Sequence, residues 1–316
     1  MSGKKIIAVV GATGAQGGGV VRAILEDPSG GFSVRALTRD PRARRARQLA
    51  ESGASVVHAD LDDVRSLREA FAGAHAAFCL TFFWNHLSPE KELVQAGAMA
   101  GAARDCGLQH VIWSTLEDTR LWVPLGDNRM PTLMGRFKVP HFDAKGEANH
   151  LFTDCGVPTT FLLTSFYWDN LIEFGMGPKR GADGTPEITF PMGHAKLPGI
   201  AVQDIGACAY RMFRDRERFV GQTVGVAGEH LTGFEMAGAL SRQLGEEIRY
   251  RDISPEAYRR LPLVGAAELG NMFQFKRDFE DVFRGARSVE QSRALHPSLH
   301  TFESWLAENK HRISIG

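Results

Sequence analysis

Residues Val9–Gly19 read Val-Val-Gly-Ala-Thr-Gly-Ala-Gln-Gly-Gly-Gly and follow the apolar run Ile6–Ala8. The pattern predicts a buried strand, a glycine turn and an amphipathic helix. Gly11 would take the tight turn, Gly14 would let the main chain approach a pyrophosphate, and Gly17 would let the helix sit close to the sheet. A strand-to-helix turn without a ligand is the alternative. The order strand, glycines, helix favours a dinucleotide site with the phosphates at the helix N-terminus. The loop residues expected at the cofactor are Gly11, Thr13, Gly14, Ala15, Gln16 and Gly17.

The composition is that of an ordinary globular protein. The 316 residues are 43% hydrophobic and 23% charged, and 37 Lys and Arg balance 37 Asp and Glu. A chain without net charge gives no reason to expect nucleic acid or an anionic membrane as a direct partner. The four cysteines form no Cys-x-x-Cys pair, which argues against a metal site and a disulfide framework. With no secretory signal and no long apolar run, we expect a cytoplasmic protein.

The first half of the chain alternates strand-like and helical patterns. This alternation predicts an α/β fold with a Rossmann-type, doubly wound parallel sheet covered by helices on both faces. Glycines at 53, 107 and 156 follow helical stretches, as left-handed helix caps do. The expected strands are Lys5–Val10, Ser33–Thr38, Ser55–His58, Ala76–Leu80, His110–Ser114 and Thr159–Leu163. The expected helices are Gln16–Glu26, Pro41–Ser52, Val64–Ala72, Pro89–Cys106 and Phe142–Cys155.

The second half loses this strict alternation. We expect an NADP-binding Rossmann domain over residues 1–164 and a smaller α+β lobe over 165–316, which binds substrate or a partner and can exchange segments with the first domain. The loop Thr119–Pro140 is long, rich in proline and glycine, and follows the fifth strand on the side where open α/β sheets bind ligands. The elements expected in this half are strands at Glu187–Met192, Ile200–Val202 and Thr223–Ala227, and helices at Gln203–Arg214, Thr232–Leu244, Pro255–Arg260, Ala266–Phe275 and Phe302–Lys310.

The end of the second strand decides the choice of cofactor. A site that prefers NAD places an acid there for the ribose 2′-hydroxyl, but here Arg39 follows the strand. A guanidinium is a planar, permanently charged group that suits a 2′-phosphate, so Arg39 predicts NADP(H). Asp40 weakens the argument, because it could pair with Arg39 or accept from a ribose. The second phosphate contact would come from Arg42 or Arg44. Two further basic residues, expected on a solvated helix face, are Arg45 and Arg47.

Two further stretches are expected along the cofactor. Asp60 follows the third strand and, with Leu61, would line the adenine pocket, whereas Asp62 or Asp63 would cap the next helix. After the fourth strand comes Thr81-Phe82-Phe83-Trp84. Thr81, Phe82 and Phe83 would lie along the ribose and nicotinamide, although aromatic packing explains these rings equally well.

A short-chain dehydrogenase uses a Ser together with a Tyr-x-x-x-Lys pair on one helix face. This chain offers Ser114 at the end of the fifth strand, and then His141 and Lys145 at the i, i+4 spacing. An imidazole therefore stands where the phenol belongs. Beside an ammonium, the ring is expected to stay neutral and to be a weak acid. His141 either carries out proton transfer or only packs, while Lys145 anchors the cofactor.

The chain resembles the NmrA-like family of atypical short-chain dehydrogenases, and in particular its NADPH redox-sensor branch. The resemblance implies NADP(H) binding without the dehydrogenase tyrosine, with Arg39 at the phosphate and Lys145 near the nicotinamide. Where members of the family carry a lysine further along this loop, this chain has Ala43, so the second phosphate contact would have to come from Arg42 or Arg44. Where relatives carry Pro-Cys-Tyr-Phe-Glu-Asn, this chain has Ser165–Asn170, so Tyr167 and Asn170 are assigned to the nicotinamide pocket. The blocks that carry the resemblance are Gly11–Gly18, Thr38–Arg42, His141–Glu147, Tyr167–Leu171, Gly221-Gln222 and Asn271–Phe273.

Two functions follow from these residues. The leading hypothesis is an NADP(H)-binding redox sensor or regulator with weak or no dehydrogenase activity. Its partners would be NADPH or NADP, a regulatory protein and, in a homodimer, a second copy of the chain. The alternative is an NADPH-dependent oxidoreductase that reduces a quinone, an aryl ketone or a similar small carbonyl. In that case the catalytic set would be drawn from Ser114, His141, Lys145 and Tyr167.

Overall fold

The computed structural model describes residues 3–316, which form two compact units. The first unit contains the described residues up to Asp118, together with His141–Leu163 and Val202–Val224. The second contains Thr119–Pro140, Thr164–Ala201 and Gly225–Gly316. Each unit is therefore assembled from three separate stretches of chain. Among the helices of residues 3–316, none is long and apolar enough to cross a membrane.

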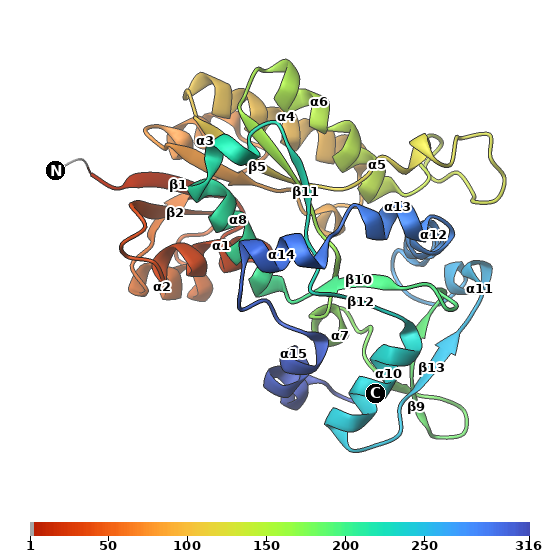
Figure 1. Cartoon of the computed structure of the whole chain (residues 1–316). Helices are drawn as coiled ribbons and strands as arrows, with labels where there is room; N and C mark the ends of the chain where they lie inside the picture. The colour runs from red at the N-terminus through yellow and green to blue at the C-terminus, as the bar shows by residue number, and fades with distance from the viewer. Residues whose placement is uncertain (1–2) are drawn as a thin grey trace. The chain divides into compact units, whose positions relative to one another are not determined.

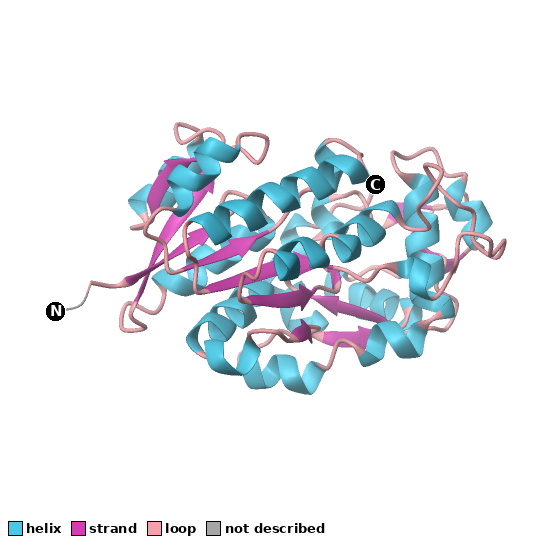
Figure 2. Cartoon of the chain, turned by 90° about the horizontal axis from the view of Figure 1, so that it is seen from above, coloured by secondary structure: helices cyan, strands magenta, loops and turns pink. Residues whose placement is uncertain are grey.

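A seven-stranded sheet forms the centre of the first unit, with the strand order β11-β6-β5-β4-β1-β2-β3. The strands from β1 to β6 pair in parallel (Figure 2). This order reverses direction between β1 and β4, which confirms the predicted doubly wound parallel sheet. The strands are β1 (Lys5–Val9), β2 (Phe32–Thr38), β3 (Ser55–His58), β4 (Ala76–Cys79), β5 (His110–Thr115), β6 (Thr159–Leu163) and β11 (Thr223–Gly225).

Helices cover both faces of this sheet because each βαβ crossover places a helix on one side (Figure 1). One layer contains α1 (Ala15–Leu25), α2 (Arg44–Glu51) and α8 (Val202–Arg214). The other contains α3 (Val64–Phe71), α4 (Pro89–Asp105) and α6 (Asn149–Asp154), and α5 (Pro140–Glu147) leads into α6. Under the second layer, the Trp113 ring of β5 stacks on Phe152 with their centroids 5.1 Å apart.

Helices α1 and α8 pack closely side by side (Figure 1). The closeness depends on Gly19 and Gly206, because a Cβ at residue 206 would lie 2.5 Å from the Gly19 carbonyl oxygen. Real Cβ atoms do not approach a backbone atom so closely. Helix α8 therefore belongs to the sheet layer of the first unit, although the chain reaches it only after a long passage through the second.

The second unit contains two three-stranded sheets, β12-β10-β7 and β13-β9-β8. The strands are short, with two to five residues each. They are β7 (Phe166–Tyr167), β8 (Lys179–Arg180), β9 (Pro186–Phe190), β10 (Leu197–Ile200), β12 (Glu229–Leu231) and β13 (Arg249–Asp252). The helices of this unit are α7 (Asn170–Glu173), α10 (Gly233–Leu244), α11 (Pro255–Arg259), α12 (Ala266–Asp278), α13 (Glu280–Gly285), α14 (Val289–Leu295) and α15 (Phe302–Asn309).

The first-half elements agree with the predictions to within a few residues at their ends. The glycines at 53, 107 and 156 have φ of +101°, +64° and +67°, which confirms the predicted left-handed caps. The helix expected over 142–155 is divided into α5 and α6. The strand expected over 200–202 is wrong in its position, since β10 ends at Ile200 and α8 begins at Val202.

Candidate functional site

The glycine loop joins the carboxyl end of β1 to α1 in a tight turn. Gly11 has a φ of +65°, and its carbonyl accepts a hydrogen bond from the Gly14 N–H at 2.8 Å. A Cβ at Gly17 would lie 2.6 Å from the carbonyl carbon of Gly11 and 2.8 Å from the Val10 oxygen. Since both atoms belong to the backbone, only glycine fits at position 17. The first turn of α1 therefore lies directly against the end of the strand.

The N-terminus of α1 is open to an anion. Gly14 is the residue that precedes the helix, so no side chain caps it, and its first turn contains no acid. The unpaired N–H groups and the positive end of the helix dipole favour negative charge at this position. Gln16, in the first turn of α1, accepts a 2.8 Å hydrogen bond through Oε1 from the Ser114 hydroxyl. Two residues predicted for different roles, Gln16 and Ser114, thus contact one another.

Arg39 lies one residue beyond β2 and is exposed. Its guanidinium takes part in no ion pair or side-chain hydrogen bond within the part of the chain that the structure describes. Asp40, which we considered as a partner for Arg39, instead accepts from the Arg42 N–H at 2.9 Å and lies 4.0 Å from the Arg42 Nε. Asp40 therefore engages Arg42 and leaves Arg39 available.

Arg45 reaches the glycine loop. It is exposed on α2, as expected, but its Nη1 also donates to the Thr13 carbonyl at 3.4 Å. Arg44, the first residue of α2, is exposed. A second positive charge thus lies over the loop itself, at a residue that the sequence assigned only to a solvated helix face. No local pattern distinguishes Arg45 from its basic neighbours, because the contact depends on the distance between β1 and α2.

The acidic residues after β3 divide into three roles. Asp63 caps α3, because its side chain accepts from the Arg65 N–H at 2.9 Å. Asp62 pairs with Lys91 at 2.7 Å, and the hydrogen bond from Lys91 lowers the pKa of the Asp62 carboxyl. Asp60 accepts from the Asp62 N–H at 3.0 Å and is half-buried, as is Leu61. Asp63 is therefore the residue that caps α3. The assignment of Asp60 to an adenine pocket stays a prediction.

Lys145 is held by two groups from other elements. Its Nζ lies 3.1 Å from the Thr81 carbonyl and 2.5 Å from the Thr81 Oγ1, just beyond β4. It also forms an ion pair with Glu92 of α4 at 3.0 Å and lies 5.3 Å from the centre of the Trp113 ring. Glu92 is only 1% exposed and was assigned no role from the sequence. An acid in the first turn of a helix is common, so nothing local marked it.

His141 is buried in an aromatic cluster. Its ring centroid lies 5.2 Å from that of Trp84, 5.8 Å from that of Phe83 and 4.8 Å from that of Phe142. Phe83 is buried and packs in this cluster, whereas Phe82 is 46% exposed. The aromatic stretch after β4 thus contains two rings that pack in the cluster, Phe83 and Trp84, and one ring that is largely exposed, Phe82.

The remaining predicted residues lie in the second unit. The Tyr167 hydroxyl is 3.1 Å from the Thr164 Oγ1, and Asn170 begins α7. The loop 119–140 also belongs to this unit and is firmly held within it. The buried Lys138 ammonium donates to the carbonyls of Asp127 and Met130, and the Asn271 amide of α12 donates to the carbonyls of Pro131 and Lys138.

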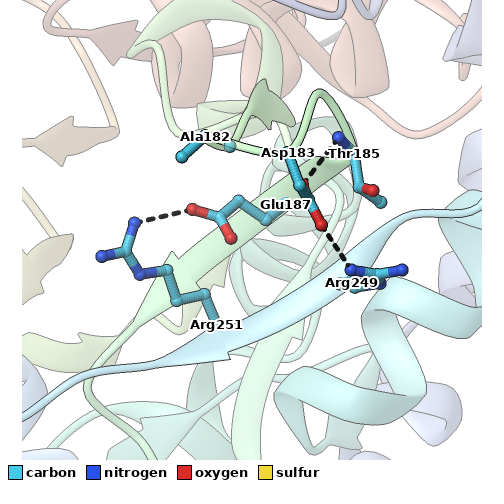
Figure 3. Close-up of a pocket in the computed structure, with 7 residues that line it drawn as sticks. Ala182, Asp183, Thr185, Glu187, Arg249 and Arg251 are labelled. Atoms are coloured by element: carbon cyan, nitrogen blue, oxygen red, sulfur yellow. Dashed lines mark hydrogen bonds and ion pairs between the residues drawn. The ribbon is translucent and has the colours of Figure 1, made fainter.

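A pocket of about 280 Å³ lies in the second unit (Figure 3). Its charged side chains are already paired: Asp183 with Arg249 and Glu187 with Arg251, each at 2.8 Å. Its lining contains none of the residues predicted for a cofactor, so we do not assign it a role in the site. Among residues 3–316, no group of three or more His, Cys, Asp or Glu side chains is arranged to hold a metal ion.

The sequence and the fold were compared with those of known proteins. The chain is 28% identical to an NmrA-like family domain-containing oxidoreductase of Cladobotryum sp, FrzB, over 85% of this chain and 83% of the relative. It is 29% identical to an NAD(P)H azoreductase of Xenophilus azovorans over 79% of this chain and 78% of the relative.

Among solved structures, the fold is similar to that of NmrA, a negative transcriptional regulator, in complex with NADP. The TM-score is 0.77 at 23% identity, covering 97% of this chain and 95% of NmrA. The model of the NmrA-like family matches residues 3–306. This chain is therefore a member of the NmrA-like family.

Proposed function

We propose that this protein binds NADP(H) at the glycine loop and acts as a redox-responsive regulator with little or no dehydrogenase turnover. The loop fits a dinucleotide: Gly17 leaves no room for a Cβ, and the N-terminus of α1 carries no capping side chain. Gly17 brings α1 close to the end of β1, and the uncapped N-terminus lets backbone N–H groups approach a pyrophosphate. The NADP complex of NmrA, which has the same fold, supports this assignment.

The preference for NADP(H) over NAD(H) rests on arginine. Arg39 is exposed and unpaired within residues 3–316, so it can bind a 2′-phosphate without first breaking an ion pair. We assign the second positive charge to Arg45, because its guanidinium already lies over the Thr13 carbonyl of the loop. Arg42 is a weaker candidate, since Asp40 lies beside it.

The regulatory role rests on one observation: both members of the dehydrogenase set that the chain retains are engaged. The Ser114 hydroxyl donates to Gln16, and Lys145 is bound to Thr81 and Glu92. The third member is His141 instead of tyrosine, and it is buried among aromatic rings. The phenol that would supply a proton is missing, and the serine hydroxyl that would bind a substrate carbonyl is bonded to Gln16. We therefore infer that the protein functions by binding the cofactor and not by oxidising it.

A second candidate is an NADPH-dependent oxidoreductase. It is favoured by the exposed ring of Phe82, which follows β4 where the cofactor's nicotinamide is expected and suits a flat aromatic substrate. The oxidoreductase and azoreductase names of relatives add support. When bound, the cofactor would supply hydride, and His141 or Tyr167 would handle the proton.

Titration of the protein with NADPH, NADP, NADH and NAD tests the cofactor. We expect R39A to weaken NADPH binding by about ten- to a hundredfold and to leave NADH binding unchanged, because it removes a charge-assisted bond to the 2′-phosphate alone. R45A should weaken NADPH binding by a smaller factor. R47A is the matched control, since it removes the same charge from the exposed side of α2. Equal affinity of the wild type for NADH and NADPH would overturn the proposal for NADP(H).

Turnover separates the two candidate functions. NADPH oxidation is measured with a panel of quinones, aryl ketones and azo dyes at saturating cofactor. A regulator gives no oxidation above the rate without protein, while NADPH still binds. Robust oxidation that H141A abolishes without loss of cofactor affinity would reject the regulatory role and favour the reductase.

A further inference from the structure

Glu92 is an unusual residue for the interior of a protein. It lies in the first turn of α4, which begins at Pro89 after the capping residue Ser88, and its side chain is 1% exposed. Glutamate is almost never fully buried unless it is paired. Within residues 3–316, neither carboxylate oxygen accepts a hydrogen bond of good geometry, so the charge is balanced by ionic contacts alone. Such a group requires an explanation.

The charge that balances Glu92 is the Lys145 ammonium. Three oxygens lie within 3.1 Å of Nζ: the carbonyl and Oγ1 of Thr81, and Oε2 of Glu92. The two contacts with Thr81 are hydrogen bonds, and the contact with Glu92 is an ion pair. The three residues come from α5, from the end of β4 and from α4. The lysine is thus fixed at a point where three elements of the first unit meet.

Other charged groups surround the pair. His86 Nε2 lies 3.9 Å from Glu92 Oε1, and its Nδ1 accepts from the Ser88 N–H, so the ring proton belongs on Nε2 and faces the carboxylate. Burial lowers the pKa of His86, which keeps the ring neutral at pH 7. Asp62 and Lys91 form their own pair nearby. Within the first unit, Lys145 is therefore the cation in direct contact with Glu92.

We propose that Glu92 is a positioning residue: its carboxylate holds the Lys145 ammonium in place beside Thr81. The inference rests on the proposed function, in which Lys145 contacts the bound cofactor near the nicotinamide. Inside a protein, an ammonium without a counter-ion is costly to bury and has no fixed place. Glu92 thereby determines cofactor affinity without touching the cofactor.

The experiment is a double-mutant cycle read by NADPH titration of the full chain. E92Q keeps the shape of the side chain and removes its charge. We expect it to weaken NADPH binding by about tenfold in the wild-type background and by less than about twofold in K145M, because neighbouring residues that act together are coupled. E92D, which keeps the carboxylate, should restore most of the affinity. Circular dichroism and thermal unfolding establish that each variant is folded.

Rescue by the conservative variant separates positioning from a merely structural effect. E92D should bind NADPH nearly as tightly as the wild type, whereas E92Q, which keeps the size of the side chain, should not, because only E92D keeps a negative charge beside Lys145. If E92Q does not fold, the same comparison is made between E92D and T81V. T81V removes one of the oxygens around Nζ and should weaken binding, while E92D should not.

The outcomes are distinct. A wild type that binds NADPH while E92Q behaves like the wild type, or weakens binding equally with and without Lys145, overturns the inference and leaves the proposed function in place. A wild type that binds no NADPH overturns both. Coupling between the two positions, together with rescue of the affinity by E92D, supports the positioning role.

Discussion

His110 is a buried histidine whose tautomer is fixed by its neighbours. The Thr160 hydroxyl donates its proton to the Phe219 carbonyl at 2.7 Å, so it can only accept from His110 Nε2, which lies 2.8 Å away. Burial, followed by the charge of Arg216, lowers the pKa of His110 to about 3. The ring is therefore neutral in the folded protein at any pH near neutrality.

This histidine makes the folded state sensitive to acid. In the unfolded chain it titrates near pH 6.5. Below that pH the ring is protonated in the unfolded state but stays neutral in the folded state. His110 makes its full contribution to the free energy of unfolding above pH 6.5. Below that pH, this contribution falls by about 1.4 kcal/mol for each pH unit until the pKa of the folded state is reached. Between pH 7 and pH 5.5, we expect the free energy of unfolding of H110Q to fall by about 1.3 kcal/mol less than that of the wild type, as measured by urea unfolding. Equal losses in the two proteins would contradict the burial of a neutral ring.

For individual residues, the sequence predicts which side chains belong to the candidate site better than it predicts which of them contact one another. Arg39 could be singled out because its position after a strand carries meaning in a Rossmann fold. Glu92, and the bond between Gln16 and Ser114, could not be predicted, because each depends on elements that are distant in the chain. A local pattern also cannot tell Arg45, which reaches the loop, from Arg47, which does not.

Helices α1 and α8 of the first unit approach each other closely. Gly19 and Gly206 face one another, and a Cβ at residue 206 would press on the backbone of Gly19 and Val20. Backbone atoms inside a helix cannot move aside as a flexible side chain can. The packing of the layer on this face of the sheet therefore depends on one glycine in α8.

We predict that G206A forces α1 and α8 apart and lowers the free energy of unfolding by about 1–3 kcal/mol, the usual range for overpacking. G101A in α4 is the matched control, because a Cβ at that helical position has nothing within 4 Å. Replacing glycine by alanine there should stabilise the protein by up to about 1 kcal/mol. Urea denaturation of both variants checks the pair, and a G206A protein as stable as G101A would show that the helices can separate without cost.

The elements predicted best are those whose signals are local. Buried parallel strands appear as continuous apolar runs, and glycine caps mark where helices end. The short strands β7, β8, β12 and β13 were not predicted, because a strand of two to four residues is defined by the segments it pairs with. The strand expected at 200–202 was misplaced, because β10 ends at Ile200 and α8 begins at Val202.

The whole molecule is divided in space but not in sequence. Each unit collects three stretches of chain, and the large sheet includes β11, which follows β6 only after residues 164–201 of the second unit and helix α8. The boundary expected near residue 164 therefore places the glycine loop and the first six strands in the first unit. The same boundary excludes α8 and the edge strand β11, which also belong to the first unit.

We predict that a fragment of residues 1–164 does not fold cooperatively. Without Val202–Val224, the face of α1 that packs on α8 and the free edge of β6 both become exposed. The fragment should bind a hydrophobic dye and unfold gradually in urea, in contrast to the full chain, which should show a sharp transition. A fragment with a sharp transition and NADPH affinity equal to that of the full protein would refute this prediction.

The division of each unit into three stretches of chain also affects how such proteins diverge. A domain encoded by one continuous stretch can be exchanged between genes by a single recombination event. Neither unit here can be transferred in that way, because every crossover point would carry part of the other unit with it. New ligands and partners must then be acquired through point substitutions and loop insertions on a scaffold inherited whole. Descendants of one ancestor would share their architecture while their activities drift apart.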